Sequence, residues 1–136
     1  MPDYIHVGDA VGCDIYRVEE GLYLVELAGH LSLGVVERLN EIVKRDCGNK
    51  PLAAVFVVTP AFVGYDHEFR APAGFMLPNT VYIGLVGLNR VLRMVAATIA
   101  IGLKIAKNVT MTAHESVDEG IGAAREALQK ARAKSG

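Results

Sequence analysis

Two short stretches of the chain, residues 52–58 and 81–86, are apolar at nearly every position and rich in β-branched side chains. A strand with one face in water alternates apolar and polar residues, so continuous runs are typical of strands covered on both faces. Such strands belong to parallel sheets, because helices carry the chain back between them and cover the sheet. The two runs therefore predict an α/β fold with both segments at the centre of the sheet.

The sequence signals for the other strands are weaker. Residues 13–18 and 22–28 are rich in Ile, Val, Tyr and Leu, and the three residues between them suit a hairpin turn, so we expect antiparallel neighbours at one edge of the sheet. Residues 109–113 predict a further short strand. The segment 59–79 is expected to hold a loop or a short helix.

Three segments carry helical signals. Apolar residues recur at three and four residue steps in 32–47, which Ser32 can cap, and in 88–107, which ends at Asn108. The last helix, over 116–131, begins with a capping box. The order predicts a mixed, mostly parallel sheet of about five strands flanked by about four helices.

The composition favours one domain over residues 1–136, with its core between about 13 and 132. Of the 136 residues, 51% are hydrophobic, which suffices for a core without a disulfide or a metal. A net charge of -1 without basic clusters argues against nucleic acid and polybasic membrane contacts. Cys13 and Cys47 form no CxxC motif, no secretory signal opens the chain, and the charge-free run 94–103 is too short to span a bilayer. We expect a cytoplasmic protein.

The element order and three segments resemble the STAS domain family, particularly its SpoIIAA-like members. The segments are VELAGHLS at residues 25–32, the strand at 52–58, and HESVDE at residues 114–119. The resemblance implies a STAS/SpoIIAA-like fold and a non-enzymatic protein-interaction module, often of bacterial signalling. Regulatory members of the family are phosphorylated on a serine just after the third strand. Here residues 59–77 contain no serine, and Thr59 precedes Pro60 in a position typical of a structural residue, so the resemblance implies no phosphoswitch.

The helix at 88–107 has two apolar rows when its residues are placed at about 100° intervals. The first row holds Leu88, Leu92, Val95, Ile99 and Leu103. The second row holds Val91, Met94, Ile101 and Ile105. One sheet cannot easily bury the side chains of both rows. Either a neighbouring helix of the domain covers the second row, or these four residues bind a partner or a second copy in a homodimer.

An alternative function is a carrier or sensor of a small apolar, lipid-like ligand. The segment 59–79 follows a central strand, at the sheet edge where ligands of open α/β sheets bind. The candidate ligand-binding residues are Phe62, Tyr65, Asp66, His67, Arg70 and Phe75. The competing interpretation is that the aromatic residues complete the core while the charged residues are solvated.

The sequence gives little support for an enzyme, a cofactor or a metal site. His67 lies between two acidic residues, but neighbours in sequence need not face one another, and no serine or cysteine lies nearby. The four histidines show no metal-binding spacing, and GLVGLN at residues 84–89 lacks a nucleotide-binding pattern. We therefore expect a non-enzymatic module that acts through residues 88–107 and 59–79.

Overall fold

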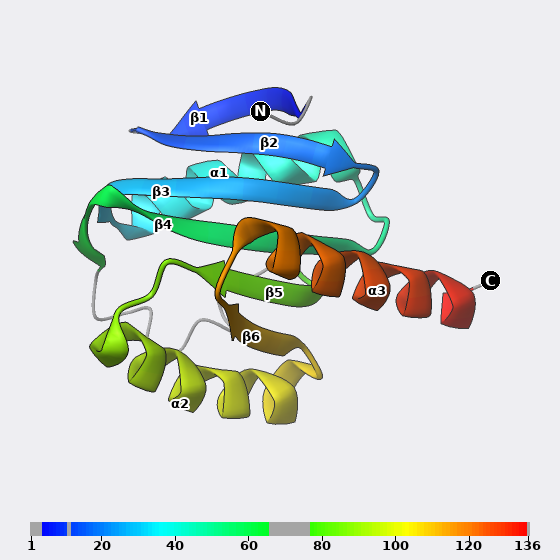
Figure 1. Cartoon of the computed structure of the whole chain (residues 1–136). Coiled ribbons are helices and arrows are strands. Elements are labelled where there is room, and N and C mark those ends of the chain that lie inside the picture. The colour runs from blue at the N-terminus through cyan, green and yellow to red at the C-terminus, as the bar shows by residue number, and fades with distance from the viewer. Residues whose placement is uncertain (1–3, 11, 66–76, 136) are drawn as a thin grey trace.

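The computed structural model describes residues 4–10, 12–65 and 77–135, which form one six-stranded sheet and three helices (Figure 1). The strands are β1 (Ile5–Ala10), β2 (Cys13–Glu19), β3 (Leu22–Leu31), β4 (Leu52–Tyr65), β5 (Thr80–Val86) and β6 (Thr110–His114). They lie in sequence order across the sheet. The pairs among β1, β2 and β3 are antiparallel, and those from β3 to β6 are parallel. The predicted α/β class is confirmed.

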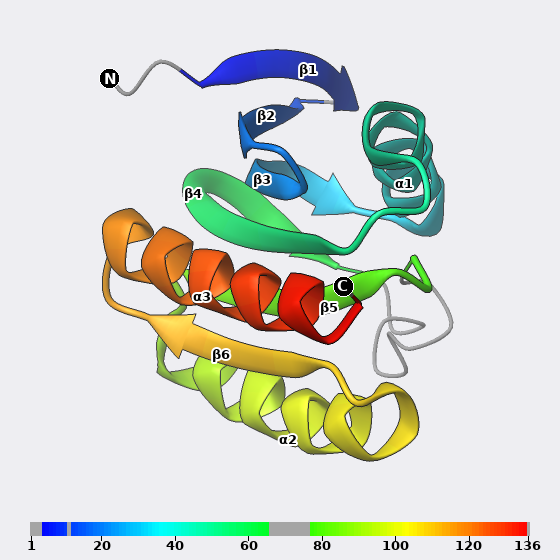
Figure 2. The same ribbon diagram turned by 90° about the vertical axis from the view of Figure 1, so that its right-hand side faces the viewer.

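The helices are α1 (Leu33–Cys47), α2 (Arg90–Lys107) and α3 (Val117–Ser135). Helices α1 and α3 cover opposite faces of the sheet (Figure 2). Strand β3 shows why both are needed, because Tyr23 and Val25 are buried with α1 whereas Leu22 and Leu24 are buried with α3. As predicted from its continuous apolar run, β4 is also covered on both faces.

Helix α2 lies at the β6 end of the sheet (Figures 1 and 2). It packs against β6 and shares with α1 the same face of the sheet, on the opposite side from α3. None of the helices that the structure describes is long and apolar enough to cross a bilayer.

The element count differs from the prediction in two places. Strand β1 was not expected, because its sequence, IHVGDA, carries a glycine and a charge among few apolar residues. It forms by pairing with β2, with Val7 packed on the α1 side of the core. The described residues contain three helices instead of about four.

Strand β4 continues through residues 59–65, where a loop or short helix was expected. Between the pairs Leu27 with Val58 and Gly29 with Phe62 the register of β3 and β4 shifts, so the strand bulges at Pro60. Proline has no N–H to give to the ladder, which accounts for the bulge. The Thr59 hydroxyl donates a hydrogen bond to the Leu27 carbonyl at 2.7 Å, which confirms the structural interpretation of Thr59.

Most helix ends follow the expected capping. Ser32 accepts a hydrogen bond from the Val35 amide at 3.3 Å, and Ser116 accepts one from the Glu119 amide at 3.2 Å. Asn108 adopts the left-handed conformation that closes α2. The start of α2 differs from the prediction, because the Asn89 side chain caps the Leu92 amide at 2.8 Å and the helix begins at Arg90.

The turn between β5 and α2 depends on Gly87, and this gives a testable prediction. Gly87 has a φ of 85°, and an added Cβ would lie 2.6 Å from the Val58 carbonyl oxygen. Gly48 also has a positive φ, 68°, but its Cβ position is open. We expect Gly87→Ala to lower the free energy of unfolding by about 3 kcal/mol or more, and Gly48→Ala by about 1 to 2 kcal/mol, in urea denaturation. Equal losses would contradict the close approach of β5 and β4 at Gly87.

Candidate docking site on helix α2

The inner side of α2 faces the sheet and an apolar groove. Leu103 is only 2% exposed, and Leu92, Val95 and Ile99 line the groove beside it. These residues belong to the first apolar row of the sequence, so this row accounts for how α2 is held on the domain.

The outer side of α2 carries the second apolar row, and it is open. The exposed fractions are 67% for Val91, 69% for Met94, 66% for Ile101 and 81% for Ile105. Nothing in residues 4–10, 12–65 or 77–135 covers them, so the interpretation in which a helix of the same domain hides this row does not hold for those residues. Together with Thr98 the row is spaced by three, four, three and four residues, the spacing of a helix that pairs with another helix. We call these five residues the α2 seam.

The polar member of the α2 seam is compatible with an apolar contact. The Thr98 hydroxyl donates a hydrogen bond to the Met94 carbonyl within the helix, at 3.3 Å. The hydroxyl is therefore satisfied inside the helix, and the methyl group is the part of the side chain left for an apolar contact. Beside the seam, a Cβ added at Gly102 would meet no heavy atom within 4 Å, so a neighbouring backbone has room to approach.

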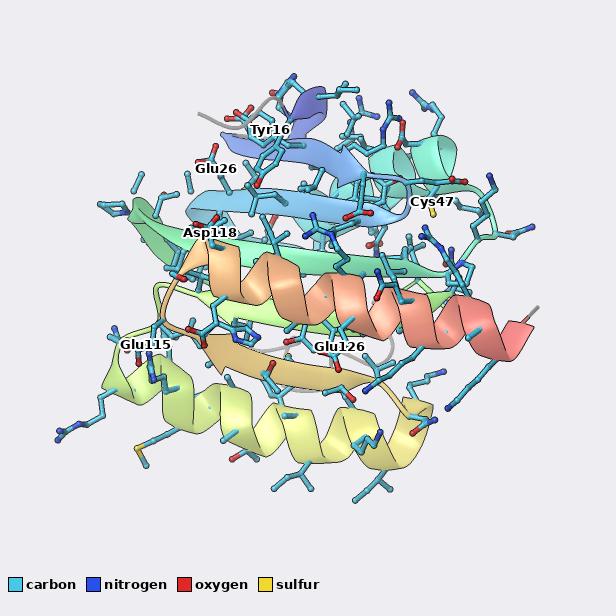
Figure 3. All side chains as sticks on the ribbon, turned by 45° about the vertical axis from the view of Figure 1, so that its right-hand side comes forward. Tyr16, Glu26, Cys47, Glu115, Asp118 and Glu126 are labelled. Atoms are coloured by element: carbon cyan, nitrogen blue, oxygen red, sulfur yellow. The ribbon has the colours of Figure 1, made fainter. Side chains whose placement is uncertain are left out.

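Helix α2 contains four basic residues and no acidic residue. Arg93 forms an ion pair with Glu115 at 3.4 Å. Glu115 lies close to the first turn of α2 (Figure 3). Arg90, Lys104 and Lys107 form no ion pair with any described residue. The four basic residues of α2 all lie on one side of the α2 seam around the helix. On the other side the next residue is Val95, which lines the groove.

The apolar groove lies between α1 and α2 and has a volume of about 270 Å³. Its floor is formed by β3, β4 and β5, including Phe56, Val58 and Leu85. Among the described lining residues Asn40 and Thr80 are polar, and the others are aliphatic, aromatic or, at Met111, a thioether. The groove can therefore hold apolar groups, and among the described lining residues Asn40 and Thr80 are the ones that could orient a head group.

The predicted ligand-binding residues are only partly described. Phe62 lines the groove. Tyr65 is the last residue of β4. Asp66, His67, Arg70 and Phe75 lie outside the described residues.

A polar cluster that the sequence interpretation missed joins β5, β6 and α3. His114 shares a hydrogen bond with Tyr82 at 2.5 Å through Nε2 and with Glu119 at 3.2 Å through Nδ1. Thr112 bonds both Tyr82 and His114. Burial raises the pKa of Tyr82, which keeps its hydroxyl neutral. The cluster fixes the first turn of α3 against the sheet. The sequence alone indicates that Thr112 and His114 share one face of a strand, because they are two residues apart. Their hydrogen-bond partners come from other elements, so the sequence does not indicate the cluster.

A second polar cluster lies at the end of α1. The Tyr23 hydroxyl donates to Asp46 at 2.6 Å, and Arg17 pairs with the same carboxylate at 2.7 Å. Cys47, at the last turn of α1, donates to the Lys50 carbonyl at 3.5 Å (Figure 3). Burial raises the pKa of the Cys47 thiol, so it stays protonated and weakly nucleophilic. Within the described part of the chain, no group of three or more His, Cys, Asp or Glu side chains is arranged to hold a metal ion.

The fold is similar to that of a solved structure. The comparison protein is described as an uncharacterized protein from the DUF3478 family with a SpoIIAA-like fold, from Shewanella loihica PV-4. The two share 9% sequence identity with a TM-score of 0.59, over 91% of this chain and 98% of the other. The chain therefore has a SpoIIAA-like fold, as the sequence resemblance implied. No family model and no curated protein matches the sequence.

The two sides of α2 predict opposite responses to truncation. We expect Leu103→Ala to lower the free energy of unfolding by about 2 to 5 kcal/mol, because it empties a buried position. We expect Ile101→Ala to change it by less than about 0.5 kcal/mol, because that side chain is in water. Urea denaturation of dilute protein measures both values. A loss for Ile101→Ala as large as for Leu103→Ala would show that the chain itself covers the α2 seam.

Proposed function

We propose that the chain is a non-enzymatic protein-interaction module, of signalling or scaffolding type, that docks through the α2 seam. One observation carries the proposal. Four large apolar side chains, exposed by 66 to 81%, lie on one face of one helix. Isolated exposed apolar residues are normal on protein surfaces, whereas a contiguous row marks an interaction site.

The free energy available from burying these four side chains supports an interaction of moderate strength. Full burial of a large aliphatic side chain is worth about 1.5 to 3 kcal/mol. Four side chains exposed by 66 to 81% leave about 4 to 8 kcal/mol of burial to be gained on docking. Association itself costs at least about 4 kcal/mol. The contact therefore suits a reversible regulatory interaction better than a permanent complex.

The α2 seam also favours a helical partner. Its members span about 80° of the helix circumference, which is the narrow stripe of a helix pair. A helix that lies in a lipid surface has a broader apolar sector, with basic residues on both sides. Here the four basic residues are on one side only. The segment 59–79 was also predicted to take part in binding. Two of its residues, Phe62 and Leu77, line the groove beside α2.

The groove favours a second candidate function, a carrier or sensor of a small apolar ligand. Its volume of about 270 Å³ is just below the usual range for small-molecule sites, and the part of its lining that the structure describes is almost wholly apolar. Native mass spectrometry distinguishes the two functions. A small mass retained by the purified chain and removed by delipidation supports the carrier, whereas a dimer without any added small mass supports the interaction module.

Photo-crosslinking in the source cell tests docking directly. A photoreactive amino acid placed at Ile101 should give covalent protein adducts, because the α2 seam is in contact with its partner. The matched control is the same amino acid at Gln129, an exposed position on α3. Adducts at Ile101 and none at Gln129 are expected on denaturing gels. Equal adducts at both positions, or none at Ile101, would contradict the proposal.

A further inference from the structure

We infer that the occupant of the α2 seam is the α2 seam of a second copy of this chain, packed antiparallel to the first. The inference rests on the proposed function and specifies the partner. It follows from the spacing of the seam, from the positions of the basic residues and from the length of the contact.

The spacing of the α2 seam is self-complementary. In an antiparallel helix pair, residues of the first heptad position face residues of the fourth. Val91, Thr98 and Ile105 occupy the first position, and Met94 and Ile101 the fourth. One register therefore places Met94 opposite Ile105 of the second copy and Thr98 opposite Ile101 of the second copy, twice each by symmetry. A symmetric contact of this kind closes as a dimer.

The charges select this register over its neighbour. If the helices slide by one heptad, Arg90 of each copy faces Lys104 of the other, so two like-charge contacts form. In the register with Met94 opposite Ile105, Lys104 instead faces Ala97 of the second copy. The three basic residues without a described partner then remain in water at the rim.

The flanks of the α2 seam allow close packing in the same register. Val95 faces Gly102 of the second copy on the groove side, and Gly102 has open space around it. Ala97 is small on the other side. Antiparallel packing also places the positive end of each helix dipole near the negative end of the other.

The contact between the two helices is short. In this register the paired residues run from Met94 to Ile105, about 17 Å of helix, and Val91 lies beyond them opposite Asn108, so we expect the interface to be smaller than that of a standard stable complex. We therefore expect a dissociation constant on the order of 10 µM, with monomer and dimer in exchange.

Sedimentation equilibrium of the full chain tests the pairing. Over roughly 1 to 300 µM, a range that brackets the expected constant, the apparent mass should rise from that of a 14.6 kDa monomer towards twice that value. Ile101→Lys should stay monomeric throughout with an unchanged melting temperature. Gln129→Lys, which adds the same charge on α3, should associate like the wild type. If Ile101→Lys fails to fold, Met94→Lys takes its place. A wild type that stays monomeric, or a lysine variant on the seam that still associates, overturns the inference.

Disulfide formation tests the register. Cys13 and Cys47 are buried, so new surface cysteines should dominate cross-linking. A mixture of Thr98→Cys and Ile101→Cys chains should cross-link faster than either chain alone, because these two positions face each other only in the antiparallel register described. Equal or faster cross-linking of Thr98→Cys alone would contradict it.

The failure of self-pairing is distinguishable from the failure of docking. If the wild type is monomeric at all concentrations but photo-crosslinking at Ile101 gives adducts with another protein, self-pairing is wrong and α2 still docks. If the adducts are with lipid alone, both self-pairing and protein docking are wrong. Without adducts at Ile101 both ideas are wrong. An adduct of twice the chain mass, together with concentration-dependent association, supports both.

Discussion

The position of α2 at the end of the sheet determines what the molecule offers to its surroundings. Strand β6 is the last strand of the sheet, and α2 is the crossover that leads to it from β5. A crossover helix in the middle of a sheet has neighbours on both sides, whereas α2 has the sheet on one side and no described element on the other. A helix in this place needs only one apolar row. Helix α2 carries two, and the second row is the reason to infer a docking partner.

The other features of the described residues are an apolar groove, a polar cluster around His114 and a buried thiol. Among the residues that the structure describes, the lining of the groove beside α2 is apolar except for Asn40 and Thr80. The His114 cluster has its polar atoms engaged with one another and connects α3 to the sheet. The thiol of Cys47 has a raised pKa and lies at a helix end, where it bonds a backbone carbonyl. Each of these groups has a structural explanation.

The sequence predicted those elements whose signals are local. The apolar runs of β4 and β5, the periodicity of α1 and the caps at Ser32 and Ser116 all correspond to the structure. The second apolar row of α2 was also visible in the sequence, because periodicity alone places residues on a helix face. Whether another helix of the domain covers that row depends on tertiary packing, and only the structure answers this for the described residues.

The features that were missed depend on distant parts of the chain. Strand β1 has a weak pattern and forms because β2 offers an edge to pair with. The extension of β4 past Pro60 requires the bulge against β3, which a local rule about proline does not predict. The His114 cluster draws on two strands and a helix. His67, which lies between two acidic residues in the sequence, is outside the described residues.

The central claim is that the outer row of α2 is in water in the single chain and is covered on association. Methyl NMR with a soluble paramagnetic agent measures this residue by residue. In dilute protein the methyl signals of Ile101 and Ile105 should be strongly broadened, and the broadening should decrease as the protein concentration rises. The Leu103 methyl signals should remain sharp at all concentrations. Sharp signals from Ile101 and Ile105 in the dilute sample would show that the chain covers this row itself, and would contradict the account.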